Sequence, residues 1–205
     1  MTCGIVAPIN PTLEPESIAA LLRETDAKVL VTLRAFPKTN VSDLASQAVA
    51  LSPNIKTVIE LDLLPHLSGI SRLIVPLIRP KNSTQHSAKI IDFNQSLALQ
   101  NDTELTFKED LTDPHCAFFH TGGTTGMPKI AQHRHTGVLY NGWIASSLIF
   151  SEDDIIMCPL PLFHVFAAYP IWAGCLVSGA HMVLPTPAGC RGEGVFDNFW
   201  KLIER

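Results

Sequence analysis

The chain has 205 residues, of which 46% are hydrophobic and 17% are charged, and its formal net charge is -4. This length and composition supply enough apolar material for the core of one large domain or two small ones. Lysine and arginine are scattered along the sequence without the basic cluster that neutralises nucleic-acid phosphates, so no nucleic-acid partner is expected.

The cysteines and the N-terminus indicate a reducing compartment. The five cysteines are widely spaced and form no CxxC pair, which argues against a disulfide framework or a zinc knuckle. No basic segment precedes an apolar run at the N-terminus, as it would in a secretory signal. A cytoplasmic protein is therefore expected.

The first third of the sequence predicts alternating strands and helices. Residues 4–10 and the continuous apolar run 28–33 predict strands, and the second run is typical of a strand covered on both faces. Apolar residues spaced three and four apart from Ile18 onward predict a helix between them. A second helix at residues 42–52 and a strand at 55–61 repeat the order. This order predicts an α/β fold of mainly parallel sheets flanked by helices.

The middle of the chain is less regular until residue 114. Residues 78–114 predict loops with a short strand and at most a short helix. Two further strands are predicted at residues 116–121 and 130–135, so the segment between them joins two strands. A helix is predicted to follow, with Thr136 as its N-cap.

Residues 155–183 contain no Lys, Arg, Asp or Glu and are long enough to span a bilayer. Three prolines and two histidines interrupt this run, which is unfavourable for a transmembrane helix. We therefore expect a buried core segment made of a short strand, a turn and a helix, and no transmembrane segment.

The loop at residues 120–129, HTGGTTGMPK, has the composition of a phosphate-binding segment. Its three glycines let backbone amides approach an anion closely, its threonines supply hydroxyl donors, and Lys129 supplies a positive charge. The alternative is a tight connection between strands without a ligand. A Walker loop is excluded because Lys129 follows Pro128 and precedes Ile130, and no GxGxxG fingerprint follows the first strand.

The nine residues 121–129, TGGTTGMPK, resemble the phosphate-binding loop of the adenylate-forming superfamily, which includes acyl-CoA synthetases and peptide-synthetase adenylation domains. Residues 4–32, 159–167 and 195–205 are similar to other segments of that family, so the resemblance covers essentially the whole chain. The Pro-Leu-Phe-His sequence that ends at His164 is most similar to fatty-acyl-CoA synthetases.

This resemblance implies that a carboxylic acid, expected to be a fatty acid, is adenylated by ATP with Mg²⁺ and then transferred to the thiol of coenzyme A. Lys129 and Thr124 are the expected catalytic residues, and His164 is expected at the carboxylate and acyl side of the pocket. The residues expected to bind the phosphates are Thr121, Gly122, Gly123, Thr124, Thr125, Gly126 and Lys129.

Other polar residues are expected to be structural. Without the family match, His164 is a candidate core histidine bonded to backbone. His133 and His135 share a predicted strand face, but two ligands do not make a metal site, so both are expected to face solvent or cap an element. Residues 152–154 are expected to form a solvated turn, because adjacent carboxylates do not converge on a cation. No resident metal site is therefore expected.

The chain departs from the family pattern in extent and in two residues. It lacks the family's later Tyr-Gly-x-Thr-Glu segment, hinge and small C-terminal domain, so residues 1–205 are expected to be a partial N-terminal AMP-binding domain that is inactive alone. Gly122 replaces the commoner serine, and Ala167 stands where glycine is frequent.

Two alternatives to an acyl-CoA synthetase remain open. One is an adenylation domain that loads a carrier protein. The other is a non-catalytic interaction module that retains the loop, with self-association through exposed apolar surface.

Overall fold

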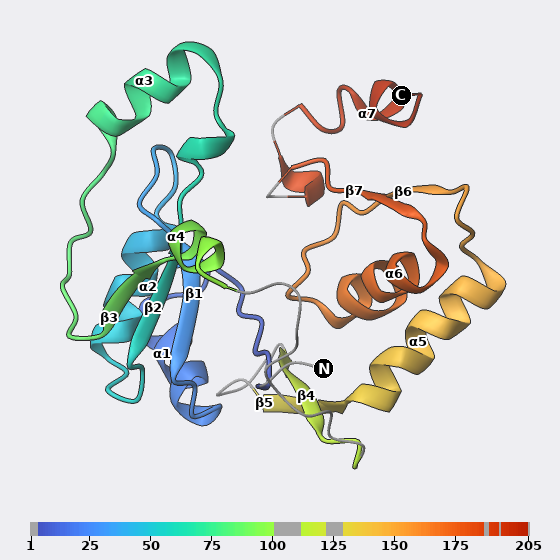
Figure 1. Ribbon diagram of the computed structural model, residues 1–205, viewed down its shortest axis with the longest axis horizontal. Helices are drawn as coiled ribbons and strands as arrows, with labels where there is room; N and C mark the ends of the chain where they lie inside the picture. The colour runs from blue at the N-terminus through green and yellow to red at the C-terminus, as the bar shows by residue number, and fades with distance from the viewer. Residues whose placement is uncertain (1–3, 101–111, 122–128, 187–188, 193, 205) are drawn as a thin grey trace. The chain divides into compact units, whose positions relative to one another are not determined.

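The computed structural model describes most of the chain, and its elements form two compact units. The first unit holds the described residues of Ile9–Lys108 together with Lys129, and the second holds those of Met1–Pro8, Glu109–Thr121 and Ile130–Arg205. Figure 1 shows the helices and strands of both units. The residues described are 4–100, 112–121, 129–186, 189–192 and 194–204.

The first unit is built on a parallel sheet with the strand order β1-β2-β3. Its register pairs Val29 with Thr57 and Thr57 with Lys89. Parallel strands need crossover connections, and helices supply them here, which confirms the α/β prediction. The elements in chain order are α1 (Pro15–Glu24), β1 (Val29–Leu33), α2 (Val41–Ala50), β2 (Thr57–Leu61), the 3-10 helix η1 (Leu64–His66), α3 (Gly69–Ile78), β3 (Lys89–Asp92) and α4 (Phe93–Ala98).

Helix α1 forms where its residues predict it. Pro15 lies in the first turn, where its missing N–H needs no partner, and Glu16 lies near the positive end of the helix dipole. Ile18 and Leu22, one turn apart, are buried in one cluster with Val58 of β2 and residues of α2. Burial of a side chain such as Leu22 stabilises the fold by roughly 2 kcal/mol. The core of this unit therefore lies between α1, α2 and the sheet.

Strand β1 is covered on one face, whereas its continuous apolar run predicts cover on both. Leu30 packs against the core formed with α1 and α2, but Val29 and Val31 are 49% and 56% exposed. Alternate residues of a strand point to opposite faces of the sheet, and α1 and α2 both pack on the face of Leu30. The expectation of two covered faces is therefore wrong.

The sequence predicts that residues 4–10 form the first strand of this sheet, but they do not join it. Val6 makes instead an isolated parallel bridge to Ala117 of the second unit, and the amide of Phe118 donates to the Val6 carbonyl at 2.8 Å. Pro8 has no N–H with which to extend the ladder, which explains why the pairing stays so short. The sheet of the first unit therefore begins at β1.

The second unit contains two small sheets and a set of helices. Strand β4 pairs with β5, and β6 pairs in parallel with β7, with Ile155 opposite His181. The strands predicted on either side of the glycine-rich segment are confirmed. The elements in chain order are β4 (His115–Thr121), β5 (Lys129–Arg134), α5 (His135–Leu148), β6 (Ile155–Met157), the π-helix η2 (Ala167–Ala173), α6 (Gly174–Ser178), β7 (His181–Val183), the 3-10 helix η3 (Gly189–Arg191) and α7 (Phe199–Ile203).

Two glycines allow α5 to lie against η2 and α6. A Cβ added to Gly174 would lie 2.7 Å from the Cβ of Ala145, and one added to Gly142 would lie 3.0 Å from the carbonyl oxygen of Ala173. Both distances are shorter than an ordinary contact between carbon and a neighbouring heavy atom. Close packing of these helices therefore requires glycine at both positions.

Helix α5 is capped by a residue outside the helix. The sequence predicts Thr136 as its N-cap, but the helix begins at His135, and Thr136 lies inside it. The Asp113 carboxylate accepts hydrogen bonds from the Thr136 amide at 2.9 Å and from Thr136 Oγ1 at 2.6 Å. The cap is therefore supplied by tertiary structure, which local sequence does not reveal.

The long uncharged run forms β6, η2, α6 and β7. Ala167, Ala168 and Cys175 are buried, as expected of a core segment, whereas Phe166 and Leu176 are exposed, so the expected burial of the whole run holds only in part. Across the part of the chain that is described, no helix is both long and apolar enough to cross a bilayer.

Candidate functional site

The predicted phosphate-binding loop is described only at its two ends. Thr121 ends β4 and Lys129 begins β5, and the side chains of both are exposed. The prediction that the loop joins two strands is therefore confirmed. Gly122, Gly123, Thr124, Thr125 and Gly126 lie outside the described residues.

Strand β4 is anchored by side chains that alternate along it. Ala117 and Phe119 are buried, and they form a cluster with Ala168 and Tyr169 of η2. The rings of Phe119 and Tyr169 meet edge to face, with centroids 5.3 Å apart. The strand that leads into the loop is therefore packed directly against the helix that follows His164.

His164 lies in the turn just before η2, and its side chain is exposed. Its amide donates to the Pro161 carbonyl at 3.0 Å, and its carbonyl accepts from the Ala168 amide at 3.1 Å. The second bond places His164 one helical turn before Ala168. The alternative of a buried core histidine is therefore wrong, and the exposed imidazole is free of the core.

His120, for which the sequence predicts no role, is affected by the charge of His164. It precedes Thr121 in β4 and is partly buried. Burial lowers the pKa of His120, and the nearby charge of His164 lowers it further. Its position directly before Thr121 links His120 to the loop in sequence, whereas strand alternation does not relate residue 120 to residue 164.

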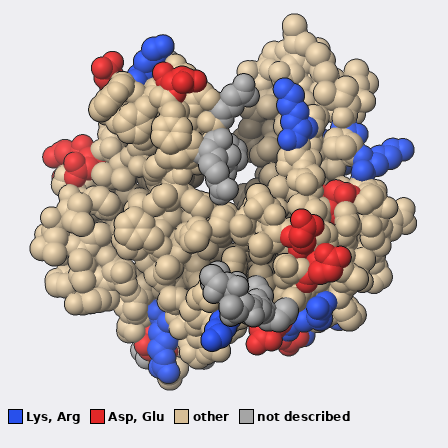
Figure 2. Space-filling model, turned by 180° about the vertical axis from the view of Figure 1, so that it is seen from behind, with Lys and Arg blue, Asp and Glu red and all other residues tan. Residues whose placement is uncertain are grey.

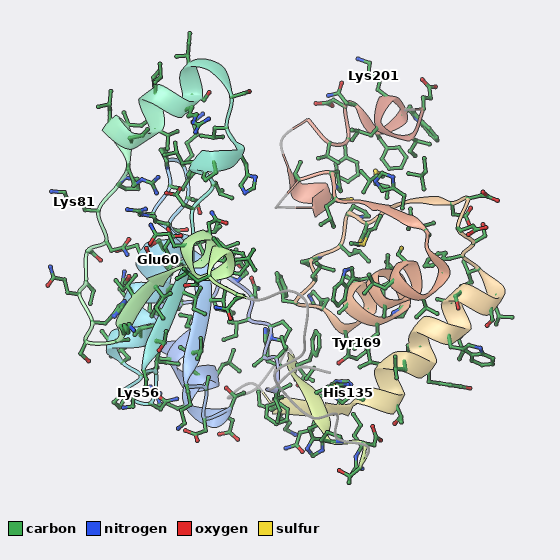
Figure 3. All side chains as sticks on the ribbon, in the orientation of Figure 1. Lys56, Glu60, Lys81, His135, Tyr169 and Lys201 are labelled. Atoms are coloured by element: carbon green, nitrogen blue, oxygen red, sulfur yellow. The ribbon has the colours of Figure 1, made fainter. Side chains whose placement is uncertain are left out.

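His133 belongs to an aromatic cluster, where the sequence predicts a residue that faces solvent or caps an element. Its ring lies edge to face with Phe119 and Tyr169, at centroid distances of 5.5 and 5.1 Å. Figure 3 labels Tyr169, which projects from η2. His135, also labelled there, begins α5, so it does not share a strand face with His133.

Two polar atoms of this aromatic cluster have no hydrogen-bond partner among the residues that the structure describes. They are His133 Nε2 and the Tyr169 hydroxyl, and both are buried. Burial lowers the pKa of His133. Burial and the neighbouring charge of Cys116 raise the pKa of Tyr169 to about 12. Burial therefore favours the uncharged form of both side chains, as expected for polar groups removed from water.

The acidic side chains, histidines and cysteines of the described segments do not gather into a metal site. Within those segments, no three His, Cys, Asp or Glu side chains come together as metal ligands would. Glu152 and Asp153 lie in an exposed turn, as predicted, and Asp154 accepts hydrogen bonds from the amide and hydroxyl of Ser151. Figure 2 shows lysine and arginine at separate places on the face it displays.

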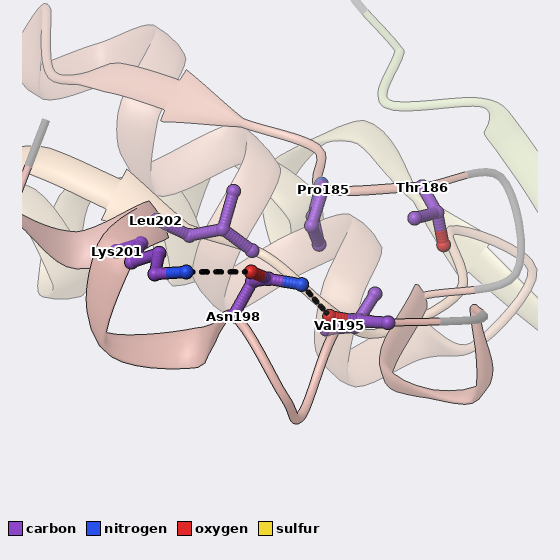
Figure 4. Close-up of a pocket in the computed structure, with 7 residues that line it drawn as sticks. Pro185, Thr186, Val195, Asn198, Lys201 and Leu202 are labelled. Atoms are coloured by element: carbon purple, nitrogen blue, oxygen red, sulfur yellow. Dashed lines mark hydrogen bonds between the residues drawn. The ribbon is translucent and has the colours of Figure 1, made fainter.

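A shallow cavity of about 340 Å³ lies near the end of the second unit (Figure 4). Asn198 contributes its amide there, donating to the Gly194 carbonyl at 2.9 Å and accepting from Lys201 Nζ at 3.4 Å. No predicted site residue lines it. The lining residues are Pro185, Thr186, Gly194, Val195, Asn198, Lys201 and Leu202.

Curated relatives of the chain are CoA ligases. It is 31% identical over 209 residues to the marinolic acid–CoA ligase of Pseudoalteromonas sp. (strain SANK 73390), a match that covers 98% of this chain and 29% of the relative. It is 29% identical over 185 residues to 4-coumarate-CoA ligase 1 of Narcissus pseudonarcissus, covering 84% and 32%. The chain therefore spans about three tenths of the length of these relatives.

The fold is that of solved adenylate-forming structures. The anthranilate CoA ligase AuaEII, in complex with anthranoyl-AMP, superimposes with a TM-score of 0.66 at 19% identity, over 89% of this chain and 30% of that one. Residues 2–205 match the family described as AMP-binding enzyme. The chain belongs to the AMP-binding enzyme family.

Proposed function

We propose that the chain is part of an ATP-dependent, AMP-forming CoA ligase. In the first step, a carboxylate oxygen attacks the α-phosphorus of ATP, the bond to the β-phosphate breaks, and pyrophosphate leaves. In the second step, the sulfur of coenzyme A attacks the acyl carbon, the acyl–oxygen bond to AMP breaks, and the thiol proton is released. The family match over residues 2–205 is the observation that carries this proposal.

The ends of the loop support the first step. Thr121 and Lys129 are exposed at the end of β4 and the start of β5, so both side chains are accessible to a nucleotide. We assign Lys129 to the charge that develops on the departing pyrophosphate, because a cation positioned there stabilises the transition state more than the bound substrate. Thr121 and the loop residues Gly122, Gly123, Thr124, Thr125 and Gly126 are assigned to the β- and γ-phosphates, with Thr124 acting alongside Lys129 in catalysis.

Mg²⁺ would neutralise phosphate charge when it accompanies ATP. The segments described contain no cluster of three His, Cys, Asp or Glu side chains that would form a protein site for it. No residue is therefore assigned as its ligand, and both steps above are written with the nucleotide, the acid and the thiol.

A fatty acid is the substrate that we favour. The support is the Pro-Leu-Phe-His sequence ending at His164 and the exposure of its imidazole. The named relatives act on marinolic acid and on 4-coumarate, so an aryl acid is the alternative that a substrate panel must include.

The chain corresponds to part of the N-terminal domain of such a ligase in this proposal. It spans 29% of the marinolic acid–CoA ligase and 32% of the 4-coumarate-CoA ligase. We therefore expect these residues to bind ATP weakly and to complete little or no turnover by themselves.

Self-association is part of the proposal, because Leu139, Tyr140 and Trp143 form an exposed apolar face on α5.

Two measurements on the same chain test the function. The first is ATP affinity by equilibrium dialysis. The second is carboxylate-dependent exchange of labelled pyrophosphate into ATP, with short, medium and long fatty acids and an aryl acid. Lys129→Ala is expected to weaken ATP binding about 10- to 100-fold, because a charge-assisted contact is lost. Lys81→Ala, another exposed lysine, is the matched control (Figure 3). Equal ATP affinity in the two variants would contradict the proposal.

A further inference from the structure

Helix α3 carries a continuous apolar stripe that the structure leaves exposed. Counted from the first of them, its members follow at spacings of three, four, seven and eight residues, so they lie on one face of the helix. Their exposed fractions run from 44% to 85%, whereas the apolar face of a helix in a folded domain is normally covered. The stripe consists of Ile70, Leu73, Ile74, Leu77 and Ile78.

The helix is held to the first unit without the use of this stripe. Figure 1 shows α3 standing clear of the sheet. Val75 lies outside the stripe and is buried, so the helix rests on the protein by another face. The C-cap residue, Arg79, donates to the Ala35 carbonyl at 2.8 Å and to the Asp62 carboxylate at 3.0 Å. The stripe is therefore an exposed apolar surface on an anchored helix.

The segment that contains α3 is positively charged. Residues 63–91 hold four lysines and arginines and no aspartate or glutamate. Asp62, the acidic residue directly before this segment, is shared by Arg34 and Arg79, so that network also carries a net positive charge. Arg72 is exposed and lies on the side of α3 opposite the stripe. Charges of one sign thus accompany the apolar surface.

An apolar stripe on one side of a helix, with cations and no acids on the other, is the pattern of a helix that lies in the interface of a membrane. An acidic lipid surface satisfies both features, because acyl chains accept the stripe and anionic headgroups attract the cations. A second copy of the chain would cover the stripe but would give the positive charge no partner. The helix has 10 residues, which is too short to span a bilayer, so it would lie along the surface.

We propose that α3 docks the protein on an anionic phospholipid surface, with its apolar stripe inserted among the acyl chains and the cations of residues 63–91 directed to the headgroups. This inference goes beyond the proposed function and does not depend on it. The attachment is peripheral and reversible, because five aliphatic side chains bury a limited apolar area.

The test measures how much of the whole chain floats with large vesicles in a sucrose gradient, without ATP or an acid. Vesicles of phosphatidylcholine and phosphatidylglycerol are compared with vesicles of phosphatidylcholine alone. The chain is expected to bind the anionic vesicles at least ~5-fold more strongly, because cations near an anionic surface add to the binding free energy. Raising the salt concentration should reduce this preference, because screening shortens the reach of the charges.

Two matched pairs of variants assign the binding to α3. Leu77→Glu is expected to weaken binding at least ~10-fold, because it places a carboxylate in the stripe that enters the acyl chains. Leu99→Glu should change the binding little, although Leu99 is 84% exposed and Leu77 is 85% exposed. Arg72→Gln should weaken binding to the anionic vesicles about 3- to 5-fold and leave binding to the neutral ones unchanged. Lys56→Gln, at an exposed lysine labelled in Figure 3, is its control.

Each outcome decides the proposal. Preferential binding to anionic vesicles that Leu77→Glu abolishes and Leu99→Glu keeps supports it, whatever the affinity of the chain for ATP. Binding to neither vesicle, or equal binding to both, overturns it, and so does an equal loss in Leu77→Glu and Leu99→Glu. If Leu77→Glu instead lowers the mass of the chain at sedimentation equilibrium without lipid, and no vesicle binding is found, the stripe joins two copies of the chain and the proposal is wrong.

Discussion

Arg79 holds Asp62 through both of its carboxylate oxygens, each 3.0 Å from Arg79 Nη2. Arg34 donates to the same carboxylate at 3.2 Å, and the Leu64 amide does so at 3.0 Å. The second guanidinium nitrogen of Arg79 reaches the Ala35 carbonyl at 2.8 Å. This network ties α3's C-terminal end to the segments that follow β1 and β2.

Asp62→Asn is expected to lower the free energy of unfolding by about 2 kcal/mol, because Arg79 loses its charge partner in a nearly buried position. Burial by itself would raise the pKa of Asp62, but the bonds from Leu64 and Arg79 and the charges of Arg79 and Arg34 outweigh it and lower the pKa below 3.8. The carboxylate therefore stabilises the fold above pH 3.8, and this contribution is lost as the pH falls through the lowered value.

Urea denaturation at neutral pH and at about pH 3 checks this prediction. The difference in the free energy of unfolding between wild type and Asp62→Asn should be smaller at the acid pH. Asp26→Asn, which removes an exposed ion pair to Lys28, serves as the control and should change little. A constant difference at both pH values would contradict the assignment.

Gly174→Ala is expected to destabilise the second unit by about 1 to 3 kcal/mol, because its Cβ would lie 2.7 Å from that of Ala145. Gly137→Ala on α5 is the matched control, since its Cβ would meet no heavy atom within 4 Å. Alanine there should be neutral or stabilising by up to about 1 kcal/mol, from helix propensity. Thermal unfolding measures the stability of both variants. An equal change in stability in Gly174→Ala and Gly137→Ala would show that the helices adjust to the added methyl group and would contradict the prediction.

Local sequence patterns predicted which helices and strands the first unit contains better than they predicted which faces of those elements are covered. The apolar spacing from Ile18 onward gave α1 because one helix face enters a core, which is a local property. The cover over β1 depends on where α1 and α2 pack, and a run such as 28–33 does not contain that information. Helix α3 was missed because Pro76 interrupts its pattern, although it is tolerated inside the helix.

The strands that flank the loop at residues 122–128 could be predicted from the sequence. Residues 116–121 and the alternating residues 130–135 predicted the two strands, and Thr121 and Lys129 lie at their ends. The packing of β4 against η2 could not be predicted, because Phe119 and Ala168, which meet in one cluster, are distant in sequence. The partial burial of His133 was missed for the same reason: Tyr169, whose ring contacts it, is distant in sequence.

His133→Leu is expected to make stability less sensitive to acid. Burial lowers the pKa of His133 below its ordinary 6.5, so the neutral ring stabilises the fold above pH 6.5. That contribution is lost as the pH falls through the lowered value. Leucine carries no proton, so the stability of the variant should decline less between about pH 7 and 5. Denaturant titrations across that range check the prediction, with His181→Leu as an exposed control.

Self-association is expected to depend on α5. Leu139, Tyr140 and Trp143 are between 57% and 62% exposed, and the rings of Tyr140 and Trp143 stack with centroids 5.9 Å apart. Trp143→Arg should weaken association at least ~10-fold, because a large apolar side chain is replaced by a charge. Sedimentation equilibrium measures the change. Trp200→Arg, an exposed tryptophan on α7, is the control, and an equal loss there would show nonspecific aggregation.

Tyr169→Phe is expected to stabilise the fold by about 1 kcal/mol, because it removes a buried hydroxyl that has no partner among the described residues. The ring contact with Phe119 is kept. The raised pKa of about 12 makes the neutral phenol a source of stability that is complete below pH 10.0 and lost as the pH rises toward 12.

Tyrosinate absorbance checks the pKa of Tyr169 directly. The chain has two tyrosines, so Tyr140→Phe leaves Tyr169 as the sole reporter. Its ionisation should coincide with alkaline unfolding, because the folded state disfavours the phenolate. A midpoint near 10 in the folded chain, or a loss of stability in Tyr169→Phe, would instead show that water or another group reaches the hydroxyl. In that case His133 Nε2, whose ring is 5.1 Å from that of Tyr169, would share the same access.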